Sequence, residues 1–217
     1  MSPARPTLPV TQPPVTQPRI TKRRAETRQR LLTAGLEVFA RKGYGHVSIE
    51  ELCTAAGYTR GAFYSQFDSL HDLFLALYDQ RAEATTAQLS DDFARSNDVD
   101  ESLPALVERV LASLTLDRDW LLVSADFRIY AARHPEVAER LASHRAGLVD
   151  TLTQGLQPRL ERAPISGPLS TADSAARAVV AVYEGVTAEL IVDHDVDAAR
   201  AWLGQLLIAM LSGDAHG

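Results

Sequence analysis

The residues best suited to a specific chemical task lie in the short segment from Thr59 to Gln66. Several of its side chains can donate hydrogen bonds to phosphate oxygens or base edges, namely Thr59, Arg60, Tyr64, Ser65 and Gln66. Gly61 and Ala62 are small, so the backbone beside them can approach a partner closely. The segment is therefore suited to contact double-stranded DNA, where a glutamine such as Gln66 can bond adenine through two atoms.

The distribution of charge favours a nucleic-acid partner for the N-terminal part of the chain only. The net charge of −6 by itself argues against such a partner. Residues 1–67 nevertheless hold ten lysines and arginines against four acidic residues, whereas residues 68–217 hold twelve against 24. A basic cluster supplies candidate phosphate contacts, namely Lys22, Arg23, Arg24 and Arg28. The alternative is a chance run of charge on a solvated face.

Helix-capping signals surround the Thr59–Gln66 segment. A helix with one apolar face is predicted from about residue 22, and Gly43 ends it. Ser48 and Glu51 have the spacing of a capping box, in which each side chain satisfies a free backbone N–H. They open a second helix, which Gly57 ends.

A third short helix is predicted to begin after Thr59 and to reach about Gln66. Only a tight turn separates it from the second helix, which is typical of a helix-turn-helix. In that motif the later helix enters the major groove with its first residues at base edges. The alternative is a small helical bundle without a nucleic-acid role.

The remainder of the chain shows helical patterns and no convincing strand, so the expected fold class is all-α. A long helix opens at Ser69, and five more are predicted at about 101–116, 118–133, 135–162, 171–193 and 196–212. The total is about nine helices. Three parts are expected: a disordered Pro-rich arm over 1–20, a helix-turn-helix DNA-binding domain over 21–68, and a ligand-binding and dimerisation domain over 69–217.

Residues 24–77 contain a long series of specific motifs: Thr27-Arg28-x-x-Leu31-Leu32-x-Ala34, Phe39-Ala40, Gly43-Tyr44, Val47-Ser48-Ile49, Ala55-Ala56-Gly57 and Gly61-Ala62-Phe63-Tyr64-x-x-Phe67. This series resembles the N-terminal domain of the TetR family of one-component transcriptional repressors. The resemblance implies that Ser48 and Tyr64 contact phosphates of a DNA operator. It also implies that the side chains facing the groove are Thr59, Arg60, Ser65 and Gln66.

Two positions depart from the family pattern. Gln66 stands where the family usually has histidine. Leu70 stands where a lysine commonly contacts phosphate, which removes one electrostatic contact per subunit.

The last two predicted helices are expected to form a homodimer. Within the helix over 171–193, the stretch Val179–Ile191 is apolar nearly all round, which suits burial on two sides, and Gly185 would permit close approach of a partner helix. The apolar positions of the two helices are Val179, Val182, Tyr183, Val186, Leu190, Ile191, Trp202, Leu206, Ile208 and Met210. In the family that it resembles, the corresponding helices form a four-helix interface. The alternative is an ordinary core helix in a monomer.

The middle of the chain is expected to bind a small, largely apolar effector. Candidate ligand-binding residues are Trp120, Phe127, Tyr130 and Tyr183, of which the first three share one helical face. Arg128 and His134 would orient a polar group, and plain core packing is the alternative for each residue. Release from the operator on ligand binding is the family default, and a corepressor remains possible.

Other classes of protein receive little support. The single cysteine, Cys53, excludes an intramolecular disulfide and suits a reducing cytoplasm. Known catalytic motifs are missing, so neither an enzyme nor a cofactor is expected. Asp193-His194-Asp195 is the most suggestive metal-binding cluster, but an acidic turn between helices explains it more simply. A membrane span is not expected, and a helical adaptor that does not bind DNA is the competing non-enzymatic class.

Overall fold

The computed structural model describes residues 22–95, 102–114 and 116–212. Within these ranges the chain forms nine α-helices and two short 3-10 helices, with no strand. The elements are α1 (Lys22–Lys42), η1 (Tyr44–His46), α2 (Ile49–Ala56), α3 (Arg60–Tyr64), α4 (Leu70–Arg95), α5 (Leu103–Ser113), α6 (Arg118–Ala131), α7 (Pro135–Arg162), η2 (Gly167–Leu169), α8 (Ala172–Asp193) and α9 (Val196–Ser212). The predicted all-α class with about nine helices is confirmed. The predicted arm, residues 1–20, lies outside the described residues.

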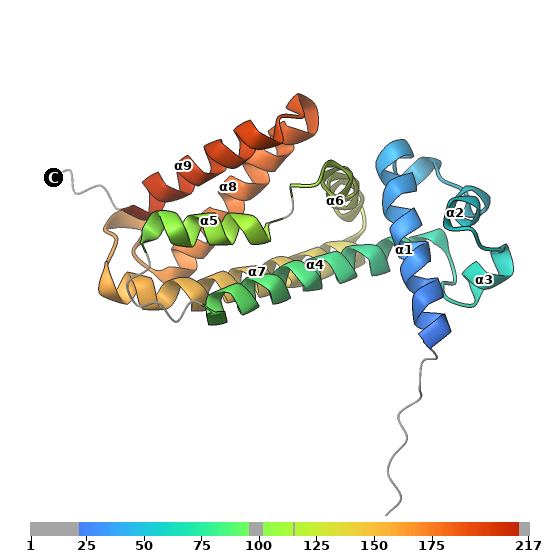
Figure 1. Ribbon diagram of the computed structural model, residues 1–217, viewed down its shortest axis with the longest axis horizontal. Coiled ribbons are helices and arrows are strands. Elements are labelled where there is room, and N and C mark those ends of the chain that lie inside the picture. The colour runs from blue at the N-terminus through green and yellow to red at the C-terminus, as the bar shows by residue number, and fades with distance from the viewer. Residues whose placement is uncertain (1–21, 96–101, 115, 213–217) are drawn as a thin grey trace, which may run out of the picture.

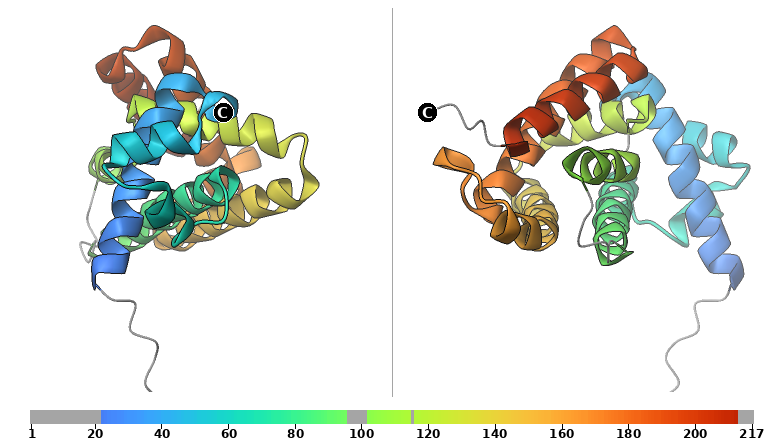
Figure 2. Two further views of the ribbon diagram at one scale, coloured as in Figure 1. Left: turned by 90° about the vertical axis from the view of Figure 1, so that its right-hand side faces the viewer. Right: turned by 60° about the vertical axis from the view of Figure 1, so that its left-hand side comes forward.

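Helices α1, α2 and α3 form a head at one end of the molecule, and α4 leads from the head into the body (Figure 1). Helices α5, α7, α8 and α9 make up the body, and α6 lies between the body and α1 (Figure 1). Views from other directions show α2 and α3 on the outer side of α1, away from the body (Figure 2). The third helix of the head is therefore open to a large partner.

The capping signals of the head form hydrogen bonds as expected. The Ser48 hydroxyl accepts from the Glu51 backbone N–H at 3.3 Å, and the Ser48 backbone N–H donates to the Glu51 carboxylate at 3.0 Å. Gly57 ends α2 in the left-handed conformation, with φ at 70°, which a residue with a side chain rarely adopts. These local contacts fix the turn between α2 and α3.

Helix α3 is shorter than the sequence predicts. The Thr59 hydroxyl accepts from the Ala62 N–H at 3.2 Å, so the helix begins where expected. It ends at Tyr64 instead of about Gln66. The carbonyl of Phe63 accepts from the N–H groups of both Gln66, at 2.9 Å, and Phe67, at 3.0 Å, and this tighter turn closes the helix.

The head and the near end of the body share one hydrophobic cluster. Its buried members extend from Leu31 in α1 through Phe74 in α4 and Phe127 in α6 to Leu190 in α8. The partly buried Tyr44 packs against this cluster, with its ring stacked on that of Phe74 at a centroid distance of 4.1 Å. The predicted domain boundary at residue 68 therefore crosses a continuous core.

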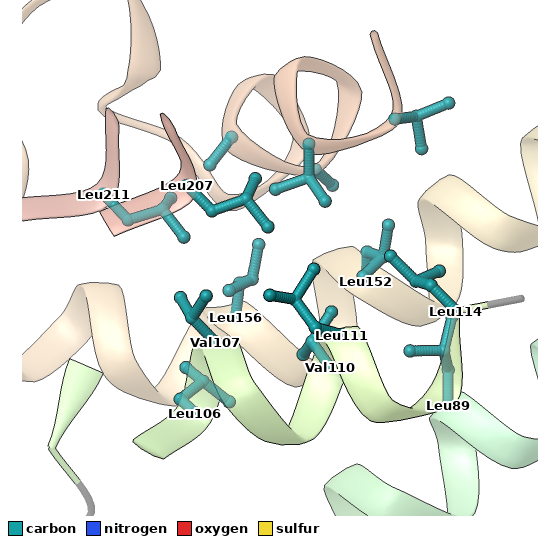
Figure 3. Close-up of a cluster of buried hydrophobic side chains, with 14 of the residues drawn as sticks. Leu89, Leu106, Val107, Val110, Leu111, Leu114, Leu152, Leu156, Leu207 and Leu211 are labelled. Carbon is teal, nitrogen blue, oxygen red and sulfur yellow. The ribbon is translucent and has the colours of Figure 1, made fainter. Parts of the chain in front are cut away.

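A second hydrophobic cluster holds the far end of the body together. Figure 3 shows Leu207 of α9 directed toward Val107 and Leu111 of α5 and toward Leu156 of α7. All four side chains are buried, which is expected of long helices that pack in layers. This cluster therefore holds α5, α7 and α9 together at the far end of the body.

Candidate functional site

The outer surface of α3 presents the side chains that the sequence predicts for DNA contact. The exposed residues are Thr59, Arg60, Gly61, Tyr64 and Ser65, and Gln66 is half-buried. Tyr64 is 47% exposed although its ring contacts Phe63 edge-on at 5.4 Å. Phe63 is fully buried and anchors the inner side of the helix. An exposed aromatic hydroxyl on a firmly anchored helix is suited to contact a phosphate group.

Two of the predicted phosphate-binding arginines are already engaged within the head. Arg24 donates to the carbonyl of Ser65 at 3.4 Å, and Arg28 donates to the carbonyl of Gln66 at 3.2 Å. The Arg28 guanidinium also lies 4.3 Å from the centroid of the Phe67 ring. Both arginines satisfy carbonyls at the end of α3, so they hold the helix against α1.

The other two basic residues of the cluster are exposed at the start of α1. Lys22 has a 93% exposed side chain and only a 4.0 Å ion pair with Glu26. Arg23 lines a groove of about 800 Å³ between α1 and α3, with Ser65 and Gln66 on its other side. Lys22 and Arg23 are therefore better placed for phosphate contacts than Arg24 and Arg28.

Arg60 is paired with an acidic residue of the preceding helix. Its Nη1 lies 2.6 Å from the Glu50 carboxylate, and both side chains are more than half exposed. The guanidinium also lies 6.0 Å from the centroid of the Tyr64 ring. Any contact between Arg60 and a base must therefore compete with Glu50.

The N-terminus of α2 is fixed by Glu51. The Lys42 ammonium and the backbone and side chain of Ser48 all donate to this carboxylate. These hydrogen bonds lower the pKa of Glu51 to about 2, with Lys42 contributing most. The predicted phosphate contact of Ser48 would add to its role as a helix cap.

A cavity of about 90 Å³ lies in the body between α4, α6, α7 and α8. Trp120 and Tyr183, two of the predicted ligand-binding residues, line it. The other two lie elsewhere: Phe127 stacks on Tyr78 at 3.8 Å within the shared core, and Tyr130 stacks on His134 at 3.8 Å beside the head. The cavity is therefore displaced from the aromatic face that the sequence suggests.

Several residues that line the cavity are not indicated by the sequence, because they lie on different helices. They are Tyr78 and Thr85 of α4, Ser124 of α6, His144 and Arg145 of α7, and Glu184 and Thr187 of α8. The only signal in the sequence is Glu184, a charge inside an otherwise apolar stretch. Arg128, considered as a possible polar contact, lines the cavity, whereas His134 does not.

Charged residues on three helices meet at the rim of the cavity. The Glu184 carboxylate lies 3.1 Å from Arg145 and 3.6 Å from Arg128. Nearby, Asp79 accepts from Arg140 and lies 2.7 Å from Nε2 of His144. Burial opposes ionisation of Asp79, but the hydrogen bonds from Arg140 and His144 outweigh it and lower the pKa of this carboxyl.

Two tyrosines bring neutral hydroxyl groups to the same space. Burial is the main cause that raises the pKa of Tyr183 to about 12, and burial also raises the pKa of Tyr78. Both therefore stay uncharged at neutral pH.

Helix α6 connects this cavity to the head. Arg128 and Ser124 line the cavity, and Asp126 on the same helix accepts a hydrogen bond from the Tyr44 backbone N–H at 2.9 Å. A displacement of α6 would thus act on the head through a direct contact.

The face predicted for dimerisation is only partly exposed. Val179, Val186 and Leu190 are buried within the protomer itself. Val192 is 74% exposed and Trp202 is 51% exposed, and the exposed Gly185 has open space around its Cα atom. These three residues mark the part of α8 and α9 that is open to a partner.

The described residues contain neither a membrane-spanning helix nor a cluster of metal ligands. None of their helices is long and apolar enough to cross a membrane. They also contain no group of three or more His, Cys, Asp or Glu side chains placed to hold a metal ion. In the Asp193-His194-Asp195 turn, His194 ends α8 in the left-handed conformation and Asp195 accepts from the Ala198 N–H at 2.9 Å, so the cluster serves to cap helices.

Proteins with similar sequences are transcriptional regulators. The sequence model of the family described as bacterial regulatory proteins, tetR family, matches residues 31–77. The transcriptional regulator AcuR of Cereibacter sphaeroides is 30% identical over 192 residues, which cover 84% of this chain and 76% of that protein. The HTH-type transcriptional regulator UidR of Escherichia coli K12 is 26% identical over 188 residues, which cover 86% of this chain and 92% of that protein.

The fold is also similar to that of solved regulators. The transcriptional regulator FadR of Bacillus subtilis, solved in complex with stearoyl-CoA, superposes with a TM-score of 0.70 at 17% sequence identity. The match covers 85% of this chain and 98% of that one. The chain belongs to the TetR family and is a DNA-binding transcriptional regulator.

Proposed function

We propose that this regulator is a repressor, and not an enzyme, that binds a palindromic operator as a homodimer and leaves it when a small, largely apolar effector binds. The observation that carries the proposal is the presentation of α3. Its donor residues face outward, Phe63 anchors its inner side, and Arg24 and Arg28 fix its end against α1. Such a regulator acts where its operator lies, in the cytoplasm at the nucleoid.

A dimer is supported by the size of one head and by the surface of α8 and α9. Helix α3 is too short to read a long site alone, so two heads spaced by about a helical turn of DNA give a specific and symmetric site. Trp202 of α9 and Val192 of α8 expose large apolar side chains, and the exposed Gly185 of α8 leaves room for a second copy of these helices to pack closely.

Release by an effector is supported by the position of α6. This helix lines the cavity through Trp120 and Arg128 and holds the head through Asp126. A ligand that alters the position of α6 would change the spacing or tilt of the two heads. A coupling free energy of about 1–3 kcal/mol is typical and is sufficient to change operator occupancy.

Retardation of DNA from the chain's own promoter region tests the proposal. We expect binding with a steep dependence on salt concentration. Arg60→Ala and Gln66→Ala should alter the preference among operator variants, whereas Tyr64→Phe should weaken binding to all variants by a similar factor. Arg133→Ala, an exposed change beyond the end of α6, is the control and should leave binding unchanged.

Two outcomes would contradict this assignment. Equal losses across operator variants in Arg60→Ala, Gln66→Ala and Tyr64→Phe would refute the division between base and phosphate contacts. Absence of retardation at low salt would refute DNA binding at this promoter and favour a helical adaptor.

Light scattering of Trp202→Glu tests the dimer separately. The introduced charge should yield a monomer. Ile129→Glu is the matched control, because Ile129 is 55% exposed but lies on α6, away from the proposed interface. A dimer in both variants would contradict the proposed interface.

A further inference from the structure

The charges that line the body cavity do not cancel. Glu184 is the one carboxylate among the described residues that line it, and it faces two guanidinium groups, those of Arg128 and Arg145. His144 also lines the cavity, but its Nε2 atom is directed to Asp79, which Arg140 pairs as well. The two guanidinium groups share one carboxylate, so this part of the lining carries one positive charge in excess.

Arg128 is the guanidinium that is less firmly held. Arg145 lies within hydrogen-bonding distance of Glu184, at 3.1 Å, whereas Arg128 is 3.6 Å away, which exceeds the length of a good hydrogen bond. A guanidinium can bind a planar carboxylate through two parallel hydrogen bonds. A single surplus charge also favours a monoanion over a dianion such as phosphate.

The cavity is small, and part of its lining is apolar. Trp120, Leu121 and Val180 line it and are buried. The volume of about 90 Å³ is below the roughly 150 Å³ that accommodates benzene in an engineered cavity. An occupant must therefore combine one charged end with a tail of only a few carbon atoms.

We propose that the effector is a monocarboxylate with a short apolar tail. Its carboxylate accepts hydrogen bonds from Arg128 and Arg145 at the rim, and its tail lies against Trp120 and Val180. This assignment rests on the proposed function for its role as an effector, although the binding itself can be measured without DNA. It refines the largely apolar ligand that the sequence suggests.

Binding of the carboxylate would compete with Glu184 for Arg128. Arg128 lies on α6 and Glu184 on α8, so their ion pair links the two helices. A ligand that takes Arg128 replaces this link, and α6 is the helix that holds Tyr44 of the head. Binding in the cavity would thus change the contacts of α6 and, through Asp126 and Tyr44, act on the head.

Calorimetry tests the proposal by measuring the affinity of straight-chain carboxylates from propanoate to hexanoate. The primary amide and the primary amine of the same chain length are measured for comparison at equal ionic strength. We expect carboxylates to bind and to raise Tm by about 3–6 °C at ten times the Kd. Affinity should rise about fourfold per methylene group until the cavity is full. Amides and amines should bind at least tenfold more weakly.

Three variants identify the residues responsible. Arg128→Gln should weaken carboxylate binding about tenfold or more. Glu184→Gln should strengthen it, because the competing carboxylate is removed. Arg118→Gln removes the same charge from the exposed start of α6, outside the cavity, and should leave binding unchanged. Circular dichroism of each variant checks that it is folded, and Glu184→Gln keeps the proposal testable if Arg128→Gln does not fold.

The possible results separate this proposal from the proposed function. Equal binding of amides or amines, no binding by any carboxylate, or weaker carboxylate binding in Glu184→Gln would overturn the ligand class. Operator retardation would be unaffected by that failure. If carboxylates bind as expected but the protein does not retard DNA, the ligand assignment stands and the repressor assignment fails.

Discussion

The carboxylate of Asp126 in α6 accepts a hydrogen bond from the backbone N–H of Tyr44 in the head at 2.9 Å. The two residues are separated by 82 positions in the chain. Gly43, next to Tyr44, has φ at 80°, and this conformation directs the chain from the end of α1 toward α6. The contact joins the DNA-binding head to a helix that lines the body cavity.

We therefore expect Asp126→Ala to lower the free energy of unfolding by about 1–2 kcal/mol, because a backbone donor loses a charged acceptor. The same variant should reduce the effect of an effector on operator affinity. Urea unfolding and operator binding with and without effector measure the two quantities. Asp126→Asn retains an acceptor oxygen and should lose less stability. Equal losses in both variants would show that the Tyr44 contact is not the cause.

Removal of the Glu50 charge, which pairs with Arg60, is expected to increase the affinity for DNA. In Glu50→Gln the Arg60 guanidinium no longer has an anionic partner at 2.6 Å, and a negative charge near the expected phosphates is removed. Operator affinity should rise several-fold, and the gain should be larger at low salt, where repulsion between Glu50 and the phosphates is screened least. Fluorescence anisotropy at four salt concentrations provides the measurement.

A double-mutant cycle separates the two causes of this increase. Combining Glu50→Gln with Arg60→Gln should remove most of the gain if it depends on release of Arg60. Glu37→Gln, which removes an exposed acid of α1, controls for the change in net charge. An equal gain in the Arg60→Gln background would mean that Glu50 acts only through long-range repulsion.

Gly155 in α7 is required by the position of Phe93 in α4. A Cβ atom at residue 155 would overlap the Phe93 ring. Gly155→Ala should therefore lower the free energy of unfolding by about 1–3 kcal/mol. Gly147→Ala lies on the same helix with nothing within 4 Å, and should be neutral or stabilising by up to about 1 kcal/mol. Thermal unfolding compares the pair directly, and similar Tm values would contradict the close contact.

The sequence predicts most of the head because its signals are local. Ser48 and Glu51 are three residues apart and form their capping box whatever lies beyond them. Gly57 ends α2 for an equally local reason. The roles of Arg24 and Arg28 could not be predicted in the same way, because their carbonyl acceptors lie 41 and 38 positions along the chain. Charge alone suggested phosphate contacts for both.

The cavity was harder to predict because four helices form it. Periodicity places Trp120 and Phe127 on one face of α6, but it does not show which neighbour each will meet. Trp120 lies against the cavity, whereas Phe127 is covered by Tyr78 and Phe74. The pairing of Arg128 with Glu184 joins α6 to α8, and such a contact between distant segments has no signature in a single sequence.

Glu51 should make the stability of the head sensitive to acid. Its pKa is lowered to about 2 from an ordinary value of 4.5, chiefly by Lys42 and then by Ser48. A lowered pKa means that the ionised form stabilises the folded state, so its contribution is present above pH 4.5 and is lost as the pH falls toward 2. Glu51→Gln keeps an acceptor for Ser48 but does not titrate. Between pH 5 and pH 3 the urea midpoint of the wild-type protein should therefore fall more than that of Glu51→Gln, while Glu37→Gln should follow the wild type. Parallel loss of stability in all three proteins would show that the capping box is not an acid-sensitive element.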